Sequence, residues 1–309
     1  MNSILPVNSS YHNNPSWAVE NKRKGKLAAI CSIGSTAIGC TKTFLEEESF
    51  LNKSLGFAQK VLDAVRNRKQ YFLYFRNDDD LGLDKEIRPI AAKVGWVGCF
   101  IEKYINPIGE PVSCFFGDKV KESYSFIAHW LSTFWWRFRL CFEKIDWNGL
   151  KWIPTYLKML KKNNVEQRKR AQQEIKDLIA APLGLVGSFF TGIFIPIRAW
   201  NKFKGVENKW IDALADSGNL SQHANYIFRF TLEELFKAQE TNNKNSWFLF
   251  GIGIASNVMN TGLPIIDILP LNEKIKIFWK ELAQGLNRTF FSFRRHTKGK
   301  EWLAANVDK

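Results

Sequence analysis

The sequence lacks several short motifs that identify common enzyme classes. It contains no GxxxxGK[ST] phosphate-binding loop, no GxGxxG dinucleotide fingerprint and no GxSxG nucleophile motif. Nucleotide-binding and α/β-hydrolase activities are therefore unsupported by the residues that their chemistry needs. We predict a protein that is not an enzyme, with no catalytic residues, no cofactor and no small-molecule substrate.

Cysteine and histidine are too few and too scattered to build a metal site or a disulfide framework. The five cysteines are an odd number, lie in the first half of the chain and form no CxxC pair. The four histidines show no HExxH spacing. The acidic run 78–80 lacks the spacing of a calcium loop and is typical of a solvated turn. We therefore predict no metal ion and a reducing compartment.

The first part of the chain offers two interpretations. Residues 1–24 are polar and rich in Asn and Ser, which is typical of a flexible tail. The basic cluster at 22–26 precedes the uncharged stretch 27–41, and this order resembles a signal peptide. The cluster starts late and the stretch is rich in Gly, Ser and Thr, so we favour a structured segment over a signal.

The chain does contain much positive charge and many aromatic side chains. Its 44 Lys and Arg exceed its 30 Asp and Glu, giving a net charge of +14. Such an excess favours anionic lipid, nucleic acid or an acidic protein as partner. The 12 Trp and 25 Phe suit a surface where apolar rings meet a polar rim, as at a membrane. The alternative is an aromatic-rich soluble core.

Two 19-residue segments of the chain resemble each other closely. Residues 90–108 and 179–197 both begin Ile-Ala-Ala and both end Pro-Ile, and nine of their 19 aligned positions are identical. Average composition predicts about one or two chance matches over that length. The agreement indicates an internal repeat, which usually means that one copy cannot bury its apolar face alone.

A second signature follows the apolar segments at a fixed distance. It is a Phe-Arg pair, which occurs at Phe75-Arg76, Phe138-Arg139, Phe228-Arg229 and Phe293-Arg294. In the first three pairs the Arg lies 49 or 50 residues after the start of an Ala-containing apolar segment. The fourth copy has lost the Ala pair but keeps an uncharged apolar stretch, 247–266. We expect each Phe to fill the seam between the two halves of its unit and each Arg to point outward.

These spacings predict a mainly α protein built as a tandem repeat of four degenerate helical units. Each unit would pair an Ala/Gly-rich apolar helix or hairpin with a basic, aromatic amphipathic helix, because the aromatic residues recur at the helical period. The predicted boundaries are 25–150 for units 1 and 2, 151–177 for a basic linker helix and 178–309 for units 3 and 4. Three prolines should mark the ends of the apolar segments: Pro107, Pro196 and Pro264.

The apolar segments leave the relation to a membrane open. Residues 178–197 are uncharged for 20 positions, which is long enough to cross a bilayer. The equivalent segment of unit 2 carries Lys93, Glu102 and Lys103, and each charge near a bilayer centre costs about 2.5–3.5 kcal/mol. Four copies of one architecture therefore cannot require spanning, and packing on protein or in the lipid interface is favoured.

The leading hypothesis is a non-enzymatic helical repeat protein on the cytoplasmic face of an anionic membrane, with aromatic and apolar faces toward lipid. The first alternative is a soluble helical scaffold that binds nucleic acid or an acidic protein, and helical self-association is also open. A multispanning protein is the third interpretation. The residues predicted to contact membrane or partner are Trp130, Trp135, Trp136, Arg137, Arg139, Trp200, Lys202, Lys204, Trp279, Arg294 and Arg295.

Overall fold

The computed structural model of the chain describes residues 15–70, 97–98, 100–113, 115–116, 118–128, 145, 147–161 and 164–306. Within these residues every regular element is a helix and no strand occurs, which confirms the prediction of a mainly α protein. The elements are α1 (Pro15–Lys42), α2 (Phe50–Gln70), η3 (Ile101–Ile105), α4 (Asn106–Ser113), α5 (Asp118–Ala128), η6 (Gly149–Trp152), α7 (Ile153–Leu160), α8 (Val165–Phe203), α9 (Lys209–Tyr226), η7 (Ile227–Thr231), α10 (Leu232–Thr241), α11 (Lys244–Thr261), α12 (Leu263–Ile268) and α13 (Glu273–Asn306).

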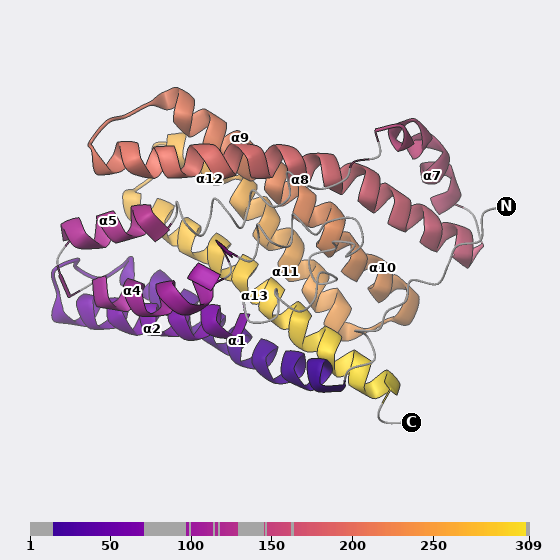
Figure 1. The fold of residues 1–309 in the computed structure, drawn as a ribbon, viewed down its shortest axis with the longest axis horizontal. Coiled ribbons are helices and arrows are strands. Elements are labelled where there is room, and N and C mark those ends of the chain that lie inside the picture. The colour runs from indigo at the N-terminus through magenta and orange to yellow at the C-terminus, as the bar shows by residue number, and fades with distance from the viewer. Residues whose placement is uncertain are drawn as a thin grey trace.

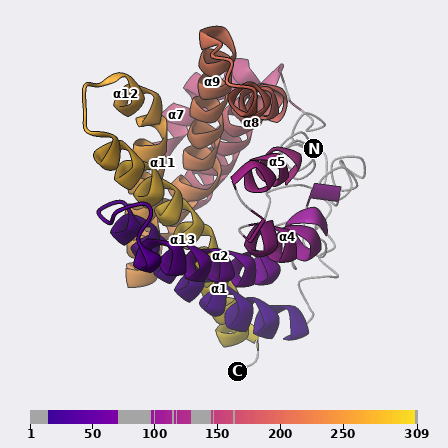
Figure 2. The same ribbon diagram turned by 90° about the vertical axis from the view of Figure 1, so that its left-hand side faces the viewer.

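Three long helical hairpins form the body of the molecule. Figures 1 and 2 show α8 with α9 along one side, α1 with α2 along the opposite side, and α11 with α13 between them. The connections 43–49, 204–208 and 262–272 all lie at the left in Figure 1, and we call this the turn end. The rings of Phe44 and Phe278 lie 5.7 Å apart there. The α10–α11 turn and the C-terminal end of α13 lie at the other end.

Small residues let the helices of these hairpins approach closely. A Cβ atom added to Gly25 of α1 would lie 2.6 Å from the backbone nitrogen of His296 on α13, and one added to Gly299 would lie 2.6 Å from that of Lys22. A Cβ on Gly187 of α8 would likewise lie 2.7 Å from the backbone nitrogen of Gln222 on α9. Such contacts between small residues are typical of helix pairs in membranes, although soluble helices also form them.

Asparagine side chains cap the N-termini of four helices in the second half of the chain. Asn164, Asn208 and Asn243 each accept a hydrogen bond from a backbone N–H in the first turn of α8, α9 and α11, at 2.9–3.2 Å. Asn272 does the same for α13, accepting from Lys274 at 2.9 Å. These bonds satisfy amide groups that have no partner inside the helix, so the local sequence defines where each helix starts.

An apolar core cluster lies where η7, α11 and α13 meet. Phe230, Leu249 and Phe290 are buried there. Phe230 belongs to η7, a π-helical turn in which Arg229, Phe230 and Thr231 are all buried. In an α-helix the third of three successive residues points about 200° away from the first, so all three would not face the same side. The wider π-helical turn reduces this angle and brings one more side chain toward the interior.

Two predicted boundaries differ from the observed helices. Residues 15–24, assigned to the tail by composition, form the first turns of α1 and pack on α13 through the buried Ala18 and Asn21. The linker 151–177 is divided, because α7 ends at Leu160 and the rest belongs to α8.

The prediction that Pro196 ends its apolar segment is wrong. α8 continues to Phe203 with Pro182 and Pro196 inside it. Proline removes one backbone hydrogen bond but has a helical φ, and packing on α9 stabilises the helix through both positions. Pro264 does lie at a boundary, in the first turn of α12.

The expectation for the Phe-Arg pairs is also wrong where it can be examined. Arg229 and Arg294 are 3% and 4% exposed, whereas Phe228 and Phe293 are only partly buried. Arg294 is buried because two carboxylates of α10 neutralise it, which no periodicity along a single helix could show. The pairs Phe75-Arg76 and Phe138-Arg139 lie outside the described residues.

Candidate membrane-binding surface

The distribution of polarity in the described part of the protein is inverted. Of its buried residues, 26 are polar or charged and 17 are hydrophobic, and ten of these 17 are alanines. At the same time 38 large hydrophobic residues are exposed. Scattered apolar residues on a surface are normal. An interior of small and polar residues beneath an apolar surface is unusual for a protein surrounded by water. Packing of this kind is expected where the exterior meets lipid or another protein.

Helix α11 illustrates the inversion. Its buried face is mostly small or polar, since it comprises Ser246, Leu249, Gly253, Ser256, Asn257 and Asn260. Trp247, Phe248 and Val258 on the outer side are 42%, 51% and 56% exposed. The buried amides are bonded within the protein: the Asn260 side chain donates to the carbonyl oxygen of Ala283 on α13 at 2.9 Å. The polar groups therefore hold helices together instead of meeting solvent.

Large apolar side chains are concentrated at the turn end. Phe50, Trp210 and Ile268, one beside each of the three connections, are 87%, 81% and 82% exposed. Further exposed hydrophobic residues on the same connections and their flanks are Phe44, Leu51, Phe203, Val206, Ile265 and Leu269. Turns in water-soluble proteins are dominated by Gly, Pro, Asn, Asp and Ser, so this composition indicates a surface that is covered in function.

A fourth turn continues this apolar surface. Phe115 and Phe116, between α4 and α5, are 71% and 67% exposed. The Phe115 ring lies 5.5 Å from the ring of Phe57 on α2. Figure 1 shows α2, α4 and α5 at the left of the molecule. Four separate chain reversals thus carry exposed aromatic or aliphatic groups on one side of the fold.

The α8–α9 connection combines rings with cations. The Lys204 ammonium lies 4.5 Å from the centre of the Trp200 ring, which also stacks on Phe203 with centroids 5.7 Å apart. Gly205 follows with φ +69°, a left-handed conformation that glycine adopts without strain. Lys202, Lys204 and Lys209 are all exposed here. Trp and Lys side chains are favoured where acyl chains meet headgroups.

Charge at the turn end is mixed. The α1–α2 connection carries Glu46, Glu47 and Glu48, all exposed, which oppose attraction to anionic lipid. A lysine near an anionic membrane contributes about 1 kcal/mol, whereas burying one large apolar side chain contributes about 1.5–3 kcal/mol. At an anionic membrane the apolar groups of this surface would therefore contribute more to binding than its charges.

The predicted contact residues divide into three groups. Trp200, Lys202 and Lys204 lie together at the turn end and are exposed, and their contact with a membrane or partner stays a prediction. Trp279 is half-buried, and its Nε1–H donates to the Met259 carbonyl oxygen at 3.0 Å. Five predicted residues lie outside the described part of the chain: Trp130, Trp135, Trp136, Arg137 and Arg139.

Arg294 and Arg295 must be removed from the predicted contact surface. They are 4% and 7% exposed, so neither guanidinium can reach a headgroup. Arg295 instead donates from Nε to the Oδ1 atom of Asn21 on α1 at 2.7 Å. Both guanidinium groups bond to side chains inside the fold.

Arg294 is the centre of a buried charge cluster between α10 and α13. Its Nη2 lies 2.8 Å from Oε2 of Glu233 and its Nε lies 3.1 Å from Oε1 of Glu234. Lys298 and Lys176 approach Glu233 within 3.6 and 3.4 Å. Burial would raise the pKa of Glu233, but these three cations lower it well below the ordinary value. Burial dominates at Glu234, whose pKa is raised, and its Oε2 finds no hydrogen-bond partner among the described residues.

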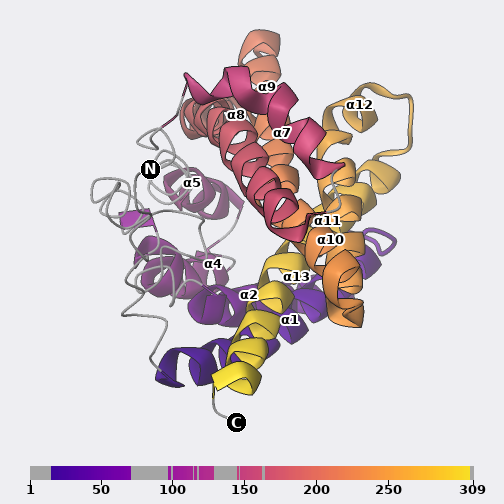
Figure 3. The same cartoon turned by 90° about the vertical axis from the view of Figure 1, so that its right-hand side faces the viewer.

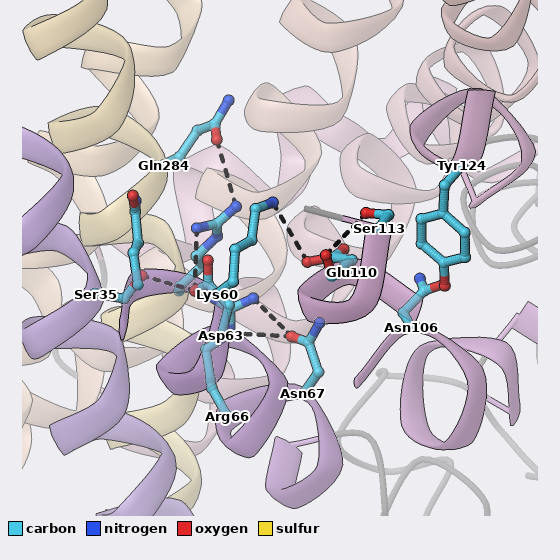
Figure 4. Close-up of polar contacts among 12 residues, drawn as sticks. Ser35, Lys60, Asp63, Arg66, Asn67, Asn106, Glu110, Ser113, Tyr124 and Gln284 are labelled. Atoms are coloured by element: carbon cyan, nitrogen blue, oxygen red, sulfur yellow. Dashed lines mark hydrogen bonds and ion pairs between the residues drawn. The ribbon is translucent and has the colours of Figure 1, made fainter. Parts of the chain in front are cut away.

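A second buried cluster, shown in Figure 4, connects α1, α2 and α13. Asp63 Oδ1 accepts from Ser35 Oγ at 2.7 Å and from Arg66 Nη1 at 2.6 Å, and Arg288 Nη1 of α13 lies 3.6 Å away. Burial alone would raise the pKa of Asp63, but the two guanidinium groups and the Ser35 hydroxyl lower it. Nearby, Lys60 reaches Glu110 of α4 at 3.5 Å. These ion pairs join the helices of the N-terminal half to one another and to α13.

One helix in the described part of the chain, α8, is long and apolar enough to cross a membrane. Within the same residues no group of three or more His, Cys, Asp or Glu side chains could hold a metal ion. Cys31 and Cys40 are free thiols, and burial raises the pKa of both.

Sequence reasoning missed the turn end itself. It concentrated on aromatic residues at helical spacing and treated connections as solvated by default. A signal was available, because Phe44, Phe50 and Ile268 are large apolar residues next to short polar or helix-breaking segments. Their convergence at one end depends on how three hairpins pack, and so it required the tertiary structure.

Comparison of the chain with protein-family models, with curated protein sequences and with solved structures yields no significant match.

Proposed function

We propose that this is a non-enzymatic protein that attaches to an anionic membrane by inserting the apolar side chains of its turn end. The observation that carries the proposal is the inverted polarity: the interior is small and polar, whereas the connections expose Phe50, Trp210 and Ile268. Lys202, Lys204 and Lys209 would lie among headgroups beside these rings. The protein sits on or partly in the lipid, and free cysteines agree with the cytoplasmic face.

Vesicle flotation tests this proposal. The purified protein is expected to float with phosphatidylserine-containing vesicles and, more weakly, with phosphatidylcholine vesicles, because apolar insertion outweighs charge at the turn end. High salt should reduce but not abolish flotation, since it screens only exposed charges. A monodisperse protein that stays soluble without detergent and ignores both vesicle types would contradict membrane attachment.

A double variant, Phe50→Asp with Trp210→Asp, separates the turn end from the rest of the surface. Both side chains are more than four-fifths exposed, so the fold should tolerate the change. Losing two large inserted groups should weaken vesicle binding by about tenfold or more. The matched control is Trp152→Asp, which changes a 51% exposed Trp in η6, beside α7 at the other end, and should leave binding unchanged. Equal losses in both proteins would argue against the turn end as the contact.

We further propose that the fold is a tandem repeat of four degenerate units. Supporting this, Ala28 and Ala29 of α1 and Ala180 and Ala181 of α8 are all buried, and each pair lies in the first arm of a hairpin. α11 and α13 form a third hairpin. Most of unit 2 lies outside the described residues, so its place rests on the sequence match between 90–108 and 179–197.

The alternative function is a soluble scaffold for nucleic acid or an acidic protein. It is favoured by four exposed cations of α1 and α13 that form no ion pair with the described residues, Lys22, Arg23, Lys26 and Lys300, rather than by the turn end. Partner capture that is salt-sensitive, with no vesicle binding, would support this alternative over membrane attachment.

A further inference from the structure

A groove lies between the N-terminal half of α1 and the C-terminal part of α13, and its walls are made mostly by the apolar stems of basic side chains whose charged ends stand at the rim. It encloses about 500 Å³ and is lined by Val19, Lys22, Arg23, Lys26, His296 and Lys300. None of these six residues is acidic. The groove lies at the end of the molecule opposite the turn end. Figure 3 shows the start of α1 beside the end of α13 there.

The cations of the groove differ from their neighbours in lacking counter-ions. No salt bridge is recorded among the described residues for Lys22, Arg23, Lys26 or Lys300. In contrast, Lys24, within the same run of α1, pairs with Glu20. Lys298 of α13 lies 3.6 Å from Glu233. On these two helices Lys24 and Lys298 are therefore paired with carboxylates and the four cations of the groove are not, so an anion would offset their charge.

A histidine hydrogen bond and two close glycine contacts hold the two walls of the groove together. His296 Nδ1 lies 2.6 Å from the Lys22 carbonyl oxygen. A carbonyl oxygen only accepts, so Nδ1 carries the proton and Nε2 is the nitrogen that can meet a ligand. The Cβ positions of Gly25 and Gly299 would clash with the facing helix backbone, so no other residue permits so close an approach. Cations from two helices are therefore brought to one site by rigid elements.

We propose that this groove binds a phosphomonoester group. A phosphomonoester carries nearly two negative charges and three acceptor oxygens at neutral pH, which suits several lysines and an arginine on opposing helices. A carboxylate carries one charge and would leave most of the cations unpaired. Nucleic acid is less suited, because single strands need aromatic stacking surfaces and the groove is lined by no Trp, Tyr or Phe. The proposal does not depend on membrane attachment through the turn end.

Two sources of the phosphomonoester share this chemistry, a free metabolite and a phosphorylated lipid headgroup. Calorimetry with soluble inositol trisphosphate tests recognition without any membrane. Flotation with phosphatidylcholine vesicles containing phosphatidylinositol bisphosphate, against phosphatidylserine vesicles of equal total charge, tests the lipid source. Binding of the soluble probe without selective flotation supports a free ligand, and binding of the probe together with selective flotation on the phosphorylated lipid supports a headgroup.

The double variant Lys22→Ala with Lys26→Ala should weaken either interaction by at least about tenfold, because two charge-assisted hydrogen bonds are lost. The matched control is Lys158→Ala with Lys161→Ala, which removes two exposed lysines of the α7 region and should change neither. No measurable binding of the soluble probe together with equal flotation on both anionic vesicles would overturn the proposal. So would equal losses in the two double variants, or a duplex DNA that competes more strongly than the phosphate probes. Loss of flotation on neutral vesicles would bear only on the turn end.

Discussion

Replacing Arg294 with leucine is expected to lower the unfolding free energy by about 3–5 kcal/mol. The guanidinium is 4% exposed and pairs with Glu233 and Glu234. Without it Glu233 keeps Lys176 and Lys298, but Glu234, which is 2% exposed, becomes a buried charge with no direct partner. Leaving one member of a buried pair uncompensated is among the most costly single changes in a protein.

Chemical denaturation of the wild-type and variant proteins measures this loss. The matched control is Arg198→Leu, which removes one partner of an ion pair with Asp216 at 2.8 Å whose side chains are 35% and 30% exposed. Because solvent screens that pair, its removal should cost about 0–1 kcal/mol. Adding Glu234→Gln to Arg294→Leu should recover part of the loss. Similar costs for the two arginine variants would show that the buried cluster is not a main source of stability.

The same cluster predicts a dependence on pH. The pKa of Glu233 is lower in the folded protein than in the unfolded chain, so its contribution to stability is present above about pH 4.3, the ordinary Glu value. That contribution is lost as the pH falls below it, and Asp63, whose pKa is also lowered, acts in the same direction. Glu234 acts oppositely, because its pKa is raised. The difference in unfolding free energy between wild type and Arg294→Leu should therefore become smaller in acid, because Glu234 takes up a proton. A difference that stays constant down to about pH 4 would contradict this expectation.

Two glycine substitutions are expected to have effects of opposite sign. Gly25→Ala should destabilise the protein by about 1–3 kcal/mol, since the new Cβ would lie 2.6 Å from the His296 backbone nitrogen and the two helices must separate. This outweighs the gain of about 1 kcal/mol in helix propensity. Gly251→Ala on α11 meets nothing within 4 Å and should stabilise by about 0.5–1 kcal/mol.

Thermal unfolding of both variants provides the comparison. If Gly25→Ala and Gly251→Ala shift the midpoint in the same direction, the close approach of α1 and α13 is not required. Gly25→Ala should also weaken phosphate binding in the groove, because it moves Lys22 and Lys26 away from Lys300. Gly251→Ala should leave that binding unchanged, which separates loss of the groove from a general effect of added bulk.

Local sequence was sufficient to predict that the chain is mainly helical. Apolar residues at the helical period predicted the aromatic part of α13, and Asn208 and Asn243 show that capping side chains define where helices begin. These features depend on interactions within a few residues, which is why they can be inferred without the fold. The uncharged stretch 178–197 was likewise found to be one continuous helical segment.

The burial of individual side chains could not be predicted in this way. Arg294 was predicted to face outward, yet it is buried because Glu233 and Glu234, 60 residues earlier, pack against it. Trp279 was predicted as a surface contact, but its indole donates to a carbonyl of α11. A charge or ring on one helix is exposed or buried according to the partner helix, and a periodic pattern carries no information about that partner.

The sequence by itself therefore determined a helical, basic protein without the catalytic motifs sought, and it located the apolar segments. The tertiary structure decided which residues meet. It brought three connections to one end with Phe50, Trp210 and Ile268 exposed, and it joined Lys22 and Lys300 across two helices in one groove. Helix formation is governed by contacts within about four residues, whereas these two surfaces arise from contacts between segments far apart in the chain.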